Sequence, residues 1–233
     1  MSARRGIFFL IAVLAGAGLV GCGGDDDSSG ESSIADLSAN EILAKTKTAV
    51  SAAKSVHASG DTVDDDGNKV KVDFRLSDGG TTGSLTTEGA TIEILAVGRD
   101  FYMKASKDAW TTLTGEAAAG ELLAGRYVKV PSNEQSLKQI ASLADWDSFV
   151  EEALTPEGTP TKGETKQLGD VEVVGLVDSK DDGTLWIPVE DDPLPVQADS
   201  SDGGVIKFTE WGEPVSVKPP PADQVIDLEE LTR

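Results

Sequence analysis

The chain has 233 residues, and its 41 acidic residues outnumber its 20 basic residues, which gives a formal net charge of −21. A surface this acidic repels nucleic acid and anionic lipid headgroups, so we exclude nucleic acid as a partner. The length suffices for one large domain or two small ones. Because the chain has a single cysteine, no disulfide within the chain can stabilise it, and packing alone must hold the fold together.

The first 21 residues have the pattern of a secretory signal peptide. Arg4 and Arg5 precede Ile7–Val20, a run of uncharged and mostly apolar residues. As a helix this run spans about 21 Å at ~1.5 Å per residue, which is short of the ~30 Å hydrocarbon core of a bilayer. A basic start, a short apolar run and small residues before a cut are typical of a signal peptide. We therefore expect residues 1–21 to be removed.

The only cysteine follows this run directly. Leu19-Val20-Gly21-Cys22 resembles a bacterial lipobox, a signal in which the cysteine receives a diacylglyceryl group and the peptide is cut before it. Stable anchoring takes two acyl chains, which a diacylated Cys22 would supply. The resemblance predicts a protein anchored by lipid to the outer face of the bacterial plasma membrane. Two alternatives stay open: an ordinary signal peptide with an incidental cysteine, and an uncleaved membrane anchor.

The segment after the cysteine predicts a flexible tether. Residues 22–38 are rich in Gly, Ser and Asp. Gly and Ser keep such a segment flexible, and acidic residues keep it extended and solvated. We expect one folded domain over residues 39–233.

The folded part begins with a predicted helix over Asn40–Ser55, whose apolar residues share one helical face and which Ser38 or Asn40 could cap. The period then changes to two. Lys69–Leu76 alternates between charged and apolar residues, so Val70, Val72, Phe74 and Leu76 are expected to face the core of an antiparallel sheet. Asp64–Asn68 predicts a hairpin turn between this strand and one over Val56–Val63.

Further short strands follow at regular intervals, separated by turn residues. We expect them over Thr82–Glu88, Ala90–Gly98, Asp100–Ala105, Tyr127–Val130, Thr165–Leu168, Val171–Asp178, Thr184–Val189, Pro195–Ser200 and Val205–Trp211.

Two predicted helices interrupt the strands. Asn133–Leu154 has a wide apolar stripe and predicts a helix, in one piece or in two with the joint at Asp145 or Asp147, and Glu116–Ala124 predicts a shorter helix. Because most neighbouring strands lack a crossover helix between them, the sheet is expected to be antiparallel. The predicted fold class is α+β: a single large curved antiparallel sheet of two sequence halves, with helices across one face.

The sequence offers no catalytic motif. The only histidine, His57, lies at the start of a predicted strand and is better explained as a structural residue. Asp64–Asn68 does not match the spacing of an EF-hand loop. The chain has no nucleotide-binding loop and no Gly-x-Ser-x-Gly elbow. We therefore expect a protein that is not an enzyme and that needs no cofactor and no metal.

The order of elements resembles the LppX/LprA/LprF/LprG family of actinobacterial lipoproteins, which are related in shape to the LolA and LolB carriers. The likeness extends from Ser38 to about Leu228. It is carried by the first helix running into Ala53–Gly60, by Phe101–Lys104 followed by Trp110, by Gly125–Pro131, and by Phe208–Val215 with Pro219-Pro220. The resemblance implies a half-barrel sheet with helices over its concave face, and a monomer that holds a lipid or lipoglycan in a hydrophobic cavity. Transport of that ligand across the cell envelope is implied as well.

Inward-facing apolar residues are the candidates for lining such a cavity, and some of them are expected to be core. They are Val72, Phe74, Leu76, Ile92, Ile94, Phe101, Met103, Leu137, Ile140, Trp146 and Phe149. Two other functions stay open. One is an envelope interaction or sensor lipoprotein with the same fold and a filled core. The other is an enzyme of envelope lipids or peptidoglycan, for which the sequence offers no convergent polar cluster.

Overall fold

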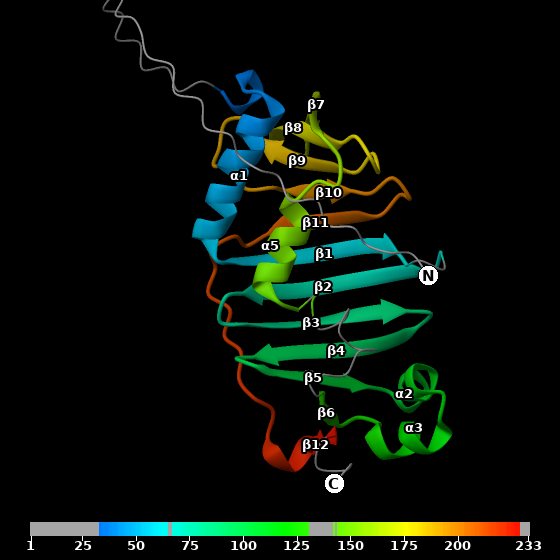
Figure 1. The fold of residues 1–233 in the computed structure, drawn as a ribbon. Helices are drawn as coiled ribbons and strands as arrows, with labels where there is room; N and C mark the ends of the chain where they lie inside the picture. Colours follow the sequence, from blue (N-terminus) through cyan, green and yellow to red (C-terminus); the bar gives the residue numbers. More distant parts are fainter. Residues whose placement is uncertain (1–32, 65–66, 131–141, 143, 229–233) are drawn as a thin grey trace, which may run out of the picture. The chain divides into compact units, whose positions relative to one another are not determined.

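The computed structural model describes residues 33–64, 67–130, 142 and 144–228 (Figure 1). The signal peptide, Cys22, most of the tether and the first part of the predicted central helix lie outside the described residues. Residues 32–233 form one compact unit.

Helix α1 (Ala39–Ala53) confirms the first predicted helix and begins with a capping box. The hydroxyl of Ser38 accepts from the backbone N–H of Glu41, while the Glu41 carboxylate accepts from the backbone N–H of Ser38 at 2.9 Å. Of the two predicted caps, Ser38 is therefore the one used. Ile42, Thr46 and Val50, spaced four residues apart, are buried, so one stripe of α1 faces the sheet.

Twelve strands form one open sheet among the described residues (Figure 1). The first group, which runs from β1 to β6, is Ser55–Val63, Lys69–Ser77, Gly80–Thr87, Ala90–Val97, Asp100–Ala105 and Tyr127–Val130. The second group, which runs from β7 to β12, is Pro160–Leu168, Val171–Asp178, Thr184–Pro188, Gln197–Asp199, Val205–Thr209 and Val225–Asp227.

The strand order is β12-β6-β5-β4-β3-β2-β1-β11-β10-β9-β8-β7. The chain enters at the centre in β1, runs outward strand by strand to β6, and resumes at the opposite edge in β7. It then returns inward to β11, which pairs with β1 in an antiparallel register with Ala58 opposite Phe208. The two sequence halves of the sheet therefore meet at this central pair of strands.

The predicted α+β class with one large antiparallel sheet is confirmed, with one exception. Strand β12 pairs with β6 in a parallel register, with Ile226 opposite Val128. Strand β12 was not predicted from the sequence, because three residues are too short for alternation to be recognised. Helix α2 (Lys107–Thr114) was not predicted either, because Trp110 is buried but most other residues of this helix are polar. Helix α3 (Ala117–Leu123) confirms the short helix predicted over Glu116–Ala124.

Strand β7 begins five residues earlier than predicted, at Pro160. Its residues do not alternate, because β7 is an edge strand with most of its side chains in solvent. Its register with β8 shifts between Lys162 and Thr165, which marks a bulge.

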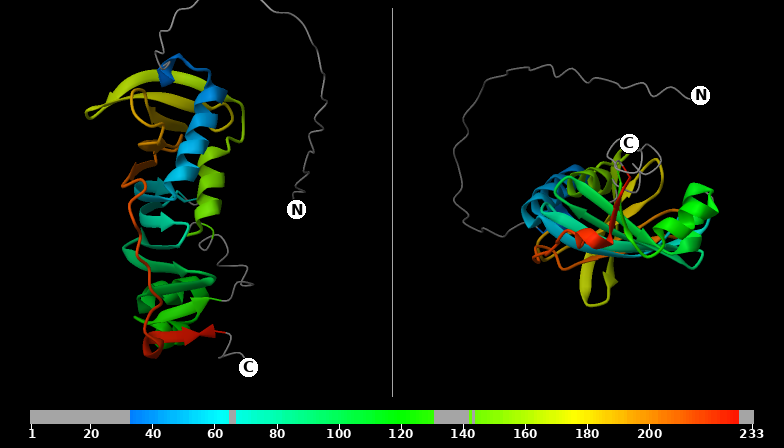
Figure 2. Two further views of the ribbon diagram at one scale, coloured as in Figure 1. Left: turned by 90° about the vertical axis from the view of Figure 1, so that its left-hand side faces the viewer. Right: turned by 90° about the horizontal axis from the view of Figure 1, so that it is seen from below.

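Helices α1 and α5 (Trp146–Leu154) lie side by side on the same face of the sheet (Figure 2). The side chain of Asp145 accepts from the backbone N–H of Ser148 at 2.8 Å, so α5 begins at one of the two predicted joints. A chain of aromatic contacts docks α5 on the centre of the sheet. Phe149 lies 5.9 Å from Trp146 and 5.9 Å from Phe208 of β11, measured between ring centroids.

The buried apolar residues form two clusters and not one continuous core. The larger lies between α1, α5 and strands β1 to β6 and β11, and the smaller lies between α1 and strands β8 and β9. Leu43 and Leu185 pack against both clusters. The part of the sheet between the two clusters is where a hollow is found.

Candidate functional site

A pocket in the described part of the chain has a volume of about 630 Å³. This volume lies within the range of about 300–1,000 Å³ that is usual for small-molecule sites. The pocket is lined by residues of both hydrophobic clusters, including Leu154 of the larger and Leu176 of the smaller. It therefore occupies the break between the two clusters.

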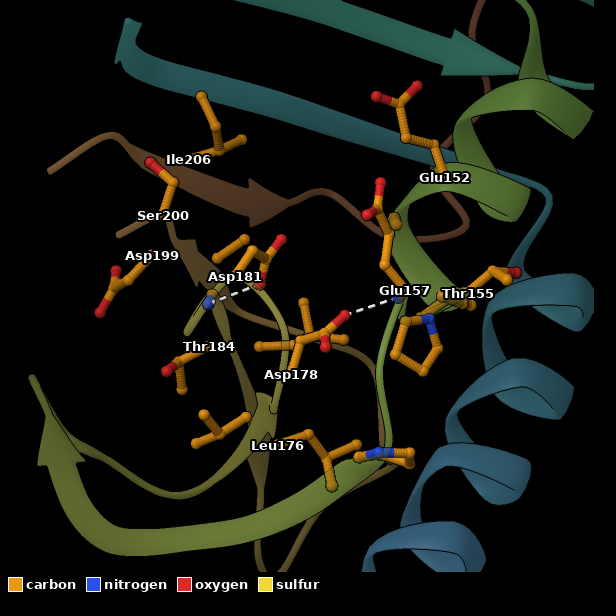
Figure 3. A pocket seen from close by; sticks show the side chains of 18 of the residues that line it. Glu152, Thr155, Glu157, Leu176, Asp178, Asp181, Thr184, Asp199, Ser200 and Ile206 are labelled. Carbon is orange, nitrogen blue, oxygen red and sulfur yellow. Dashed lines mark hydrogen bonds between the residues drawn. The ribbon is translucent and has the colours of Figure 1, made fainter. Parts of the chain in front are cut away.

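Strands β8 to β11 form one side of the pocket. Leu176, Leu185, Ala198 and Ile206 project from four neighbouring strands on the face that also carries α1 and α5. The end of α5 and the segment that follows it form the other side, and Leu43 of α1 contributes from the helix layer. Figure 3 shows Ile206, Thr184 and Leu176 on the strand side, with Glu152, Thr155 and Glu157 on the α5 side.

A single carboxylate fixes the segment between α5 and β7 against the turn between β8 and β9. Asp178 accepts hydrogen bonds from the backbone N–H of Glu157 at 2.6 Å (Figure 3) and from the backbone N–H of Gly158 at 2.9 Å. It also accepts from the backbone N–H of Lys180 at 2.9 Å, and the Lys180 ammonium pairs with the Glu157 carboxylate. These contacts hold the segment that follows α5, which forms one wall of the pocket, in place against the turn between β8 and β9.

These hydrogen bonds change the acidity of the groups involved. The backbone N–H of Lys180, together with those of Glu157 and Gly158, lowers the pKa of Asp178 below its usual value. The hydrogen bond to the Glu157 carboxylate raises the pKa of Lys180. Both residues are therefore charged at neutral pH. The clamp, by which we mean the hydrogen bonds of Asp178 and the Lys180–Glu157 ion pair, is intact there.

Gly158 is required at its position by close approach. A Cβ atom there would lie 2.5 Å from Oδ1 of Asp178 and 2.9 Å from the backbone nitrogen of Lys180. Any larger residue at position 158 would push this segment away from the turn between β8 and β9, so the close contact requires glycine.

The rim of the pocket is acidic. Among the described residues, the lining includes six carboxylates and no lysine or arginine; the six are Glu151, Glu152, Glu157, Asp178, Asp181 and Asp199. The pocket thus combines an aliphatic interior with a negatively charged edge.

Most of the cavity residues predicted from the sequence lie in the packed core. Met103 is 0% exposed, Leu76 and Ile94 are 1% exposed, and Phe74 and Ile92 are also buried. Val72 and Phe149 are partly buried and pack against the same cluster. None of these seven lines the 630 Å³ pocket, and a cavity role for them stays a prediction. Leu137, Ile140 and the lipidation candidate Cys22 lie outside the described residues.

The remaining two candidates line a smaller hollow. Phe101 and Trp146 border a space of about 240 Å³ near the start of α5. Trp146 also borders a third hollow, of about 350 Å³, between α1 and α5. Leu154 and Thr155 line both this third hollow and the large pocket, so empty space flanks the last turn of α5 on both sides.

The large pocket was not predicted from the sequence, because the candidate residues lay in the first half of the sheet and in the predicted central helix. Ile206 lies on the same face of its strand as Phe208, which is a local signal for an inward position. Apolar residues occupy both faces of Val171–Asp178, so no such signal exists for Leu176. The position of the pocket depends on tertiary packing. No local sequence pattern indicates that α5 ends above these strands, or that the core is interrupted between β9 and β11.

His57 lies on the opposite face of the sheet and has structural partners. Its Nε2 lies 3.0 Å from Oδ1 of Asp73 on β2, and its Nδ1 lies 3.4 Å from Oγ1 of Thr209 on β11. The ring thus bridges the two strands that flank β1, and His57 does not line the pocket. In the described ranges, no group of three His, Cys, Asp or Glu side chains is arranged to hold a metal ion. No helix of the described part is long and apolar enough to cross a membrane.

No protein-family model matches the sequence, and no curated protein matches it either. Solved structures that match the chain include an uncharacterized conserved protein from Thermus thermophilus. It is 12% identical, the match covers 81% of this chain and 98% of that chain, and the TM-score is 0.41. Another is the complex of MucA and MucB from Pseudomonas aeruginosa, at 16% identity and a TM-score of 0.34. That match covers 80% of this chain and spans 59% of the length of the other.

Proposed function

We propose that this protein is an envelope lipoprotein, anchored through Cys22 to the outer face of the plasma membrane. Its folded part binds one acyl chain of a lipid or lipoglycan and carries the lipid across the cell envelope. The proposal includes the finer fold assignment, in which the sheet is a half-barrel of the LolA type and α1 and α5 cover its concave face. Binding, and not catalysis, is the activity that we assign to the pocket.

The observation that carries this proposal is the pocket of about 630 Å³ between the two hydrophobic clusters. Protein cores are normally close-packed, with few voids larger than a water molecule. An aliphatic hollow of this size, lined by Leu43, Leu154, Leu176, Leu185 and Ile206, supports a role in accepting apolar groups. Each CH₂ group that leaves water contributes about 0.8 kcal/mol, so a long acyl chain gains enough to offset the costs of ordering it.

A second candidate function also has an observation in its favour. The candidates named in the first half of the sheet, such as Ile94 and Met103, are fully packed. A filled core over half of the sheet is what a non-carrier interaction or sensor lipoprotein would need. The two functions differ in one measurable property, which is whether the pocket is occupied by lipid.

Native mass spectrometry with organic extraction tests occupancy. The protein is purified from a host with a bacterial envelope, and the extract is analysed for lipid. A co-purifying lipid near one per protein supports the carrier, and its headgroup identifies the substrate class. A protein that is empty, and stays empty after incubation with the host's lipid extract, favours the interaction or sensor protein.

A matched pair of variants assigns the lipid to the pocket. Ala198→Trp places an indole between β9 and β11 and is expected to abolish co-purification. Ala117→Trp makes the same change at an exposed position on α3, and lipid binding is expected to remain. If both variants retain the lipid, the ligand binds elsewhere.

Membrane fractionation tests the anchor. Wild-type protein is expected to lie in the membrane fraction and to carry label derived from palmitate, and Cys22→Ala is expected to lose the label. A wild-type protein that is free of label would favour an uncleaved anchor if it stays in the membrane fraction and an ordinary signal peptide if it does not.

A further inference from the structure

The charged residues around the pocket indicate which kind of headgroup an apolar ligand would carry. All ionisable side chains that line it in the described part of the chain are carboxylates. A rim of one sign raises the local concentration of the opposite charge and repels its own. An acidic rim therefore favours cationic headgroups over anionic ones, whereas an aliphatic interior does not distinguish between them.

Four of the six rim carboxylates already have partners in the fold. Asp178 accepts three backbone hydrogen bonds, and Glu157 pairs with Lys180. Asp181 accepts from the backbone N–H of Gly183 at 2.8 Å. Asp199 accepts from the indole N–H of Trp186 at 2.7 Å and from the side-chain amide of Gln197 at 2.6 Å. Stability alone accounts for these four.

Glu151 and Glu152 are different. They lie in the last turn of α5, both are exposed, and neither has an ion pair or a side-chain hydrogen bond with another described residue. The C-terminal end of a helix carries partial negative charge, so a carboxylate there is unfavourable and a cation is favourable. The last turn of α5 contains no basic residue. Two adjacent charges that oppose the stability of their own helix border the pocket, which suggests a partner outside the chain.

The end of α5 adds to the same field. The last carbonyl groups of a helix lack partners within the helix and are free to accept hydrogen bonds. Leu154 and Thr155, which lie at this end, both line the pocket. Carboxylates, carbonyl groups and the helix dipole thus present negative charge and hydrogen-bond acceptors at one end of an apolar hollow.

We propose that the occupant of this pocket is a single-chain amphiphile with a protonated amine head, whose alkyl chain lies on β8 to β11 and whose ammonium group lies at Glu151 and Glu152. This inference rests on the proposed lipid binding and narrows it to one class of headgroup. An ammonium group presents three N–H donors and one positive charge, which matches the acceptors at the end of α5. A carboxylate, sulfate or phosphate head would meet the carboxylates of Glu151 and Glu152 and, among the described lining residues, no base.

The test uses three probes that share one fluorescent long alkyl chain and differ only in the head: a primary ammonium, a glucoside or a carboxylate. Affinities for the delipidated full-length protein are measured below the micelle concentration of each probe. The ammonium probe is expected to bind about three- to tenfold more tightly than the glucoside, because exposed ion pairs are individually weak. The carboxylate probe is expected to bind more weakly than the glucoside. Raising the salt above about 0.1 M, where the Debye length is ~10 Å, should reduce the differences.

A double variant locates the effect. Glu151→Gln with Glu152→Gln is expected to bring the ammonium probe to the affinity of the glucoside while leaving the glucoside unchanged. The control, Glu164→Gln with Glu172→Gln, removes two exposed carboxylates of β7 and β8 that do not line the pocket. It changes the net charge equally and should preserve the preference.

The outcomes separate the two levels of the proposal. If all three probes bind equally at low salt, the pocket accepts alkyl chains and the inference about the head is wrong. If the control variant abolishes the preference as fully as the rim variant, net charge and not this site is responsible, which also overturns the inference. If no probe binds, both the inference and the proposed lipid binding fail.

A further arm distinguishes an amphiphile from a small amine. Butylammonium chloride carries the head with almost no tail and is expected not to displace the ammonium probe. If it displaces the probe at low concentration, the site binds free amines, and the assignment of an amphiphile is wrong.

Discussion

Replacing Ala198 by Leu tests whether the pocket between the two clusters is hollow. Ala198 lies on β10 between Leu185 and Ile206 and is only partly buried. Leucine adds three carbon atoms, which at about 0.8 kcal/mol each contribute at most about 2.4 kcal/mol. Ordering the longer side chain costs about 0.5–1 kcal/mol, and the pocket is open on one side. We therefore expect Ala198→Leu to stabilise the protein by about 1 kcal/mol.

The matched control is the same substitution at Ala58, on the same face of the sheet. Ala58 is 6% exposed and lies opposite Phe74 on β2 and Phe208 on β11. Additional atoms in a packed site force neighbours out of their positions and cost about 1–3 kcal/mol. The two variants are therefore expected to differ in the sign of the change.

Urea and thermal unfolding of the delipidated protein, followed by circular dichroism, measure both changes. For a chain of this size, about 1 kcal/mol corresponds to roughly 2–4 °C in the unfolding midpoint. Ala198→Leu should raise the midpoint, and Ala58→Leu should lower it. If Ala198→Leu destabilises the protein as much as Ala58→Leu, position 198 is packed and the reasoning from an empty pocket is refuted.

Three further predictions concern the pocket wall and its support. The pKa of Asp178 is lowered in the folded state, so its carboxylate stabilises the fold at a pH above 3.8, the usual pKa of this side chain, and this contribution is lost as the pH falls below that value. Asp178→Asn should therefore lower the free energy of unfolding in urea at pH 7, and the loss should become smaller toward pH 3. Gly158→Ala should destabilise the protein by about 1–3 kcal/mol, because its Cβ would lie 2.9 Å from the backbone nitrogen of Lys180. Phe208→Ala should cost about 3–5 kcal/mol in the unfolding free energy, because Phe208 is buried between the rings of Phe149 and Trp211.

Each of these predictions has a result that contradicts it. A constant difference between wild type and Asp178→Asn from pH 7 to pH 3 would mean that the Asp178 charge does not hold the clamp. A Gly158→Ala protein with wild-type stability would show that the segment yields without cost. A loss below about 1 kcal/mol for Phe208→Ala would mean that the aromatic contacts do not fix α5 on the sheet.

Local patterns in the sequence determined most of the elements of this protein. The alternation in Lys69–Leu76 fixed which side chains of β2 face the core, and the bounds of β5, β6 and β8 agree with the prediction. The capping of α1 by Ser38 was also readable, because a capping box is a local interaction. These features depend on residues that are close in the sequence, so the sequence alone suffices for them.

Only the tertiary structure decided how the two halves of the sheet meet and where the pocket lies. The pairing of β1 with β11 joins residues that are far apart in the chain, such as His57 and Thr209, and the parallel pairing of β12 with β6 has no local signature. Leu176 and Met103 are equally apolar, yet one lines a pocket and the other is fully packed. The difference arises from where α5 ends over the sheet, because a hollow is a property of several elements together and no single segment encodes it.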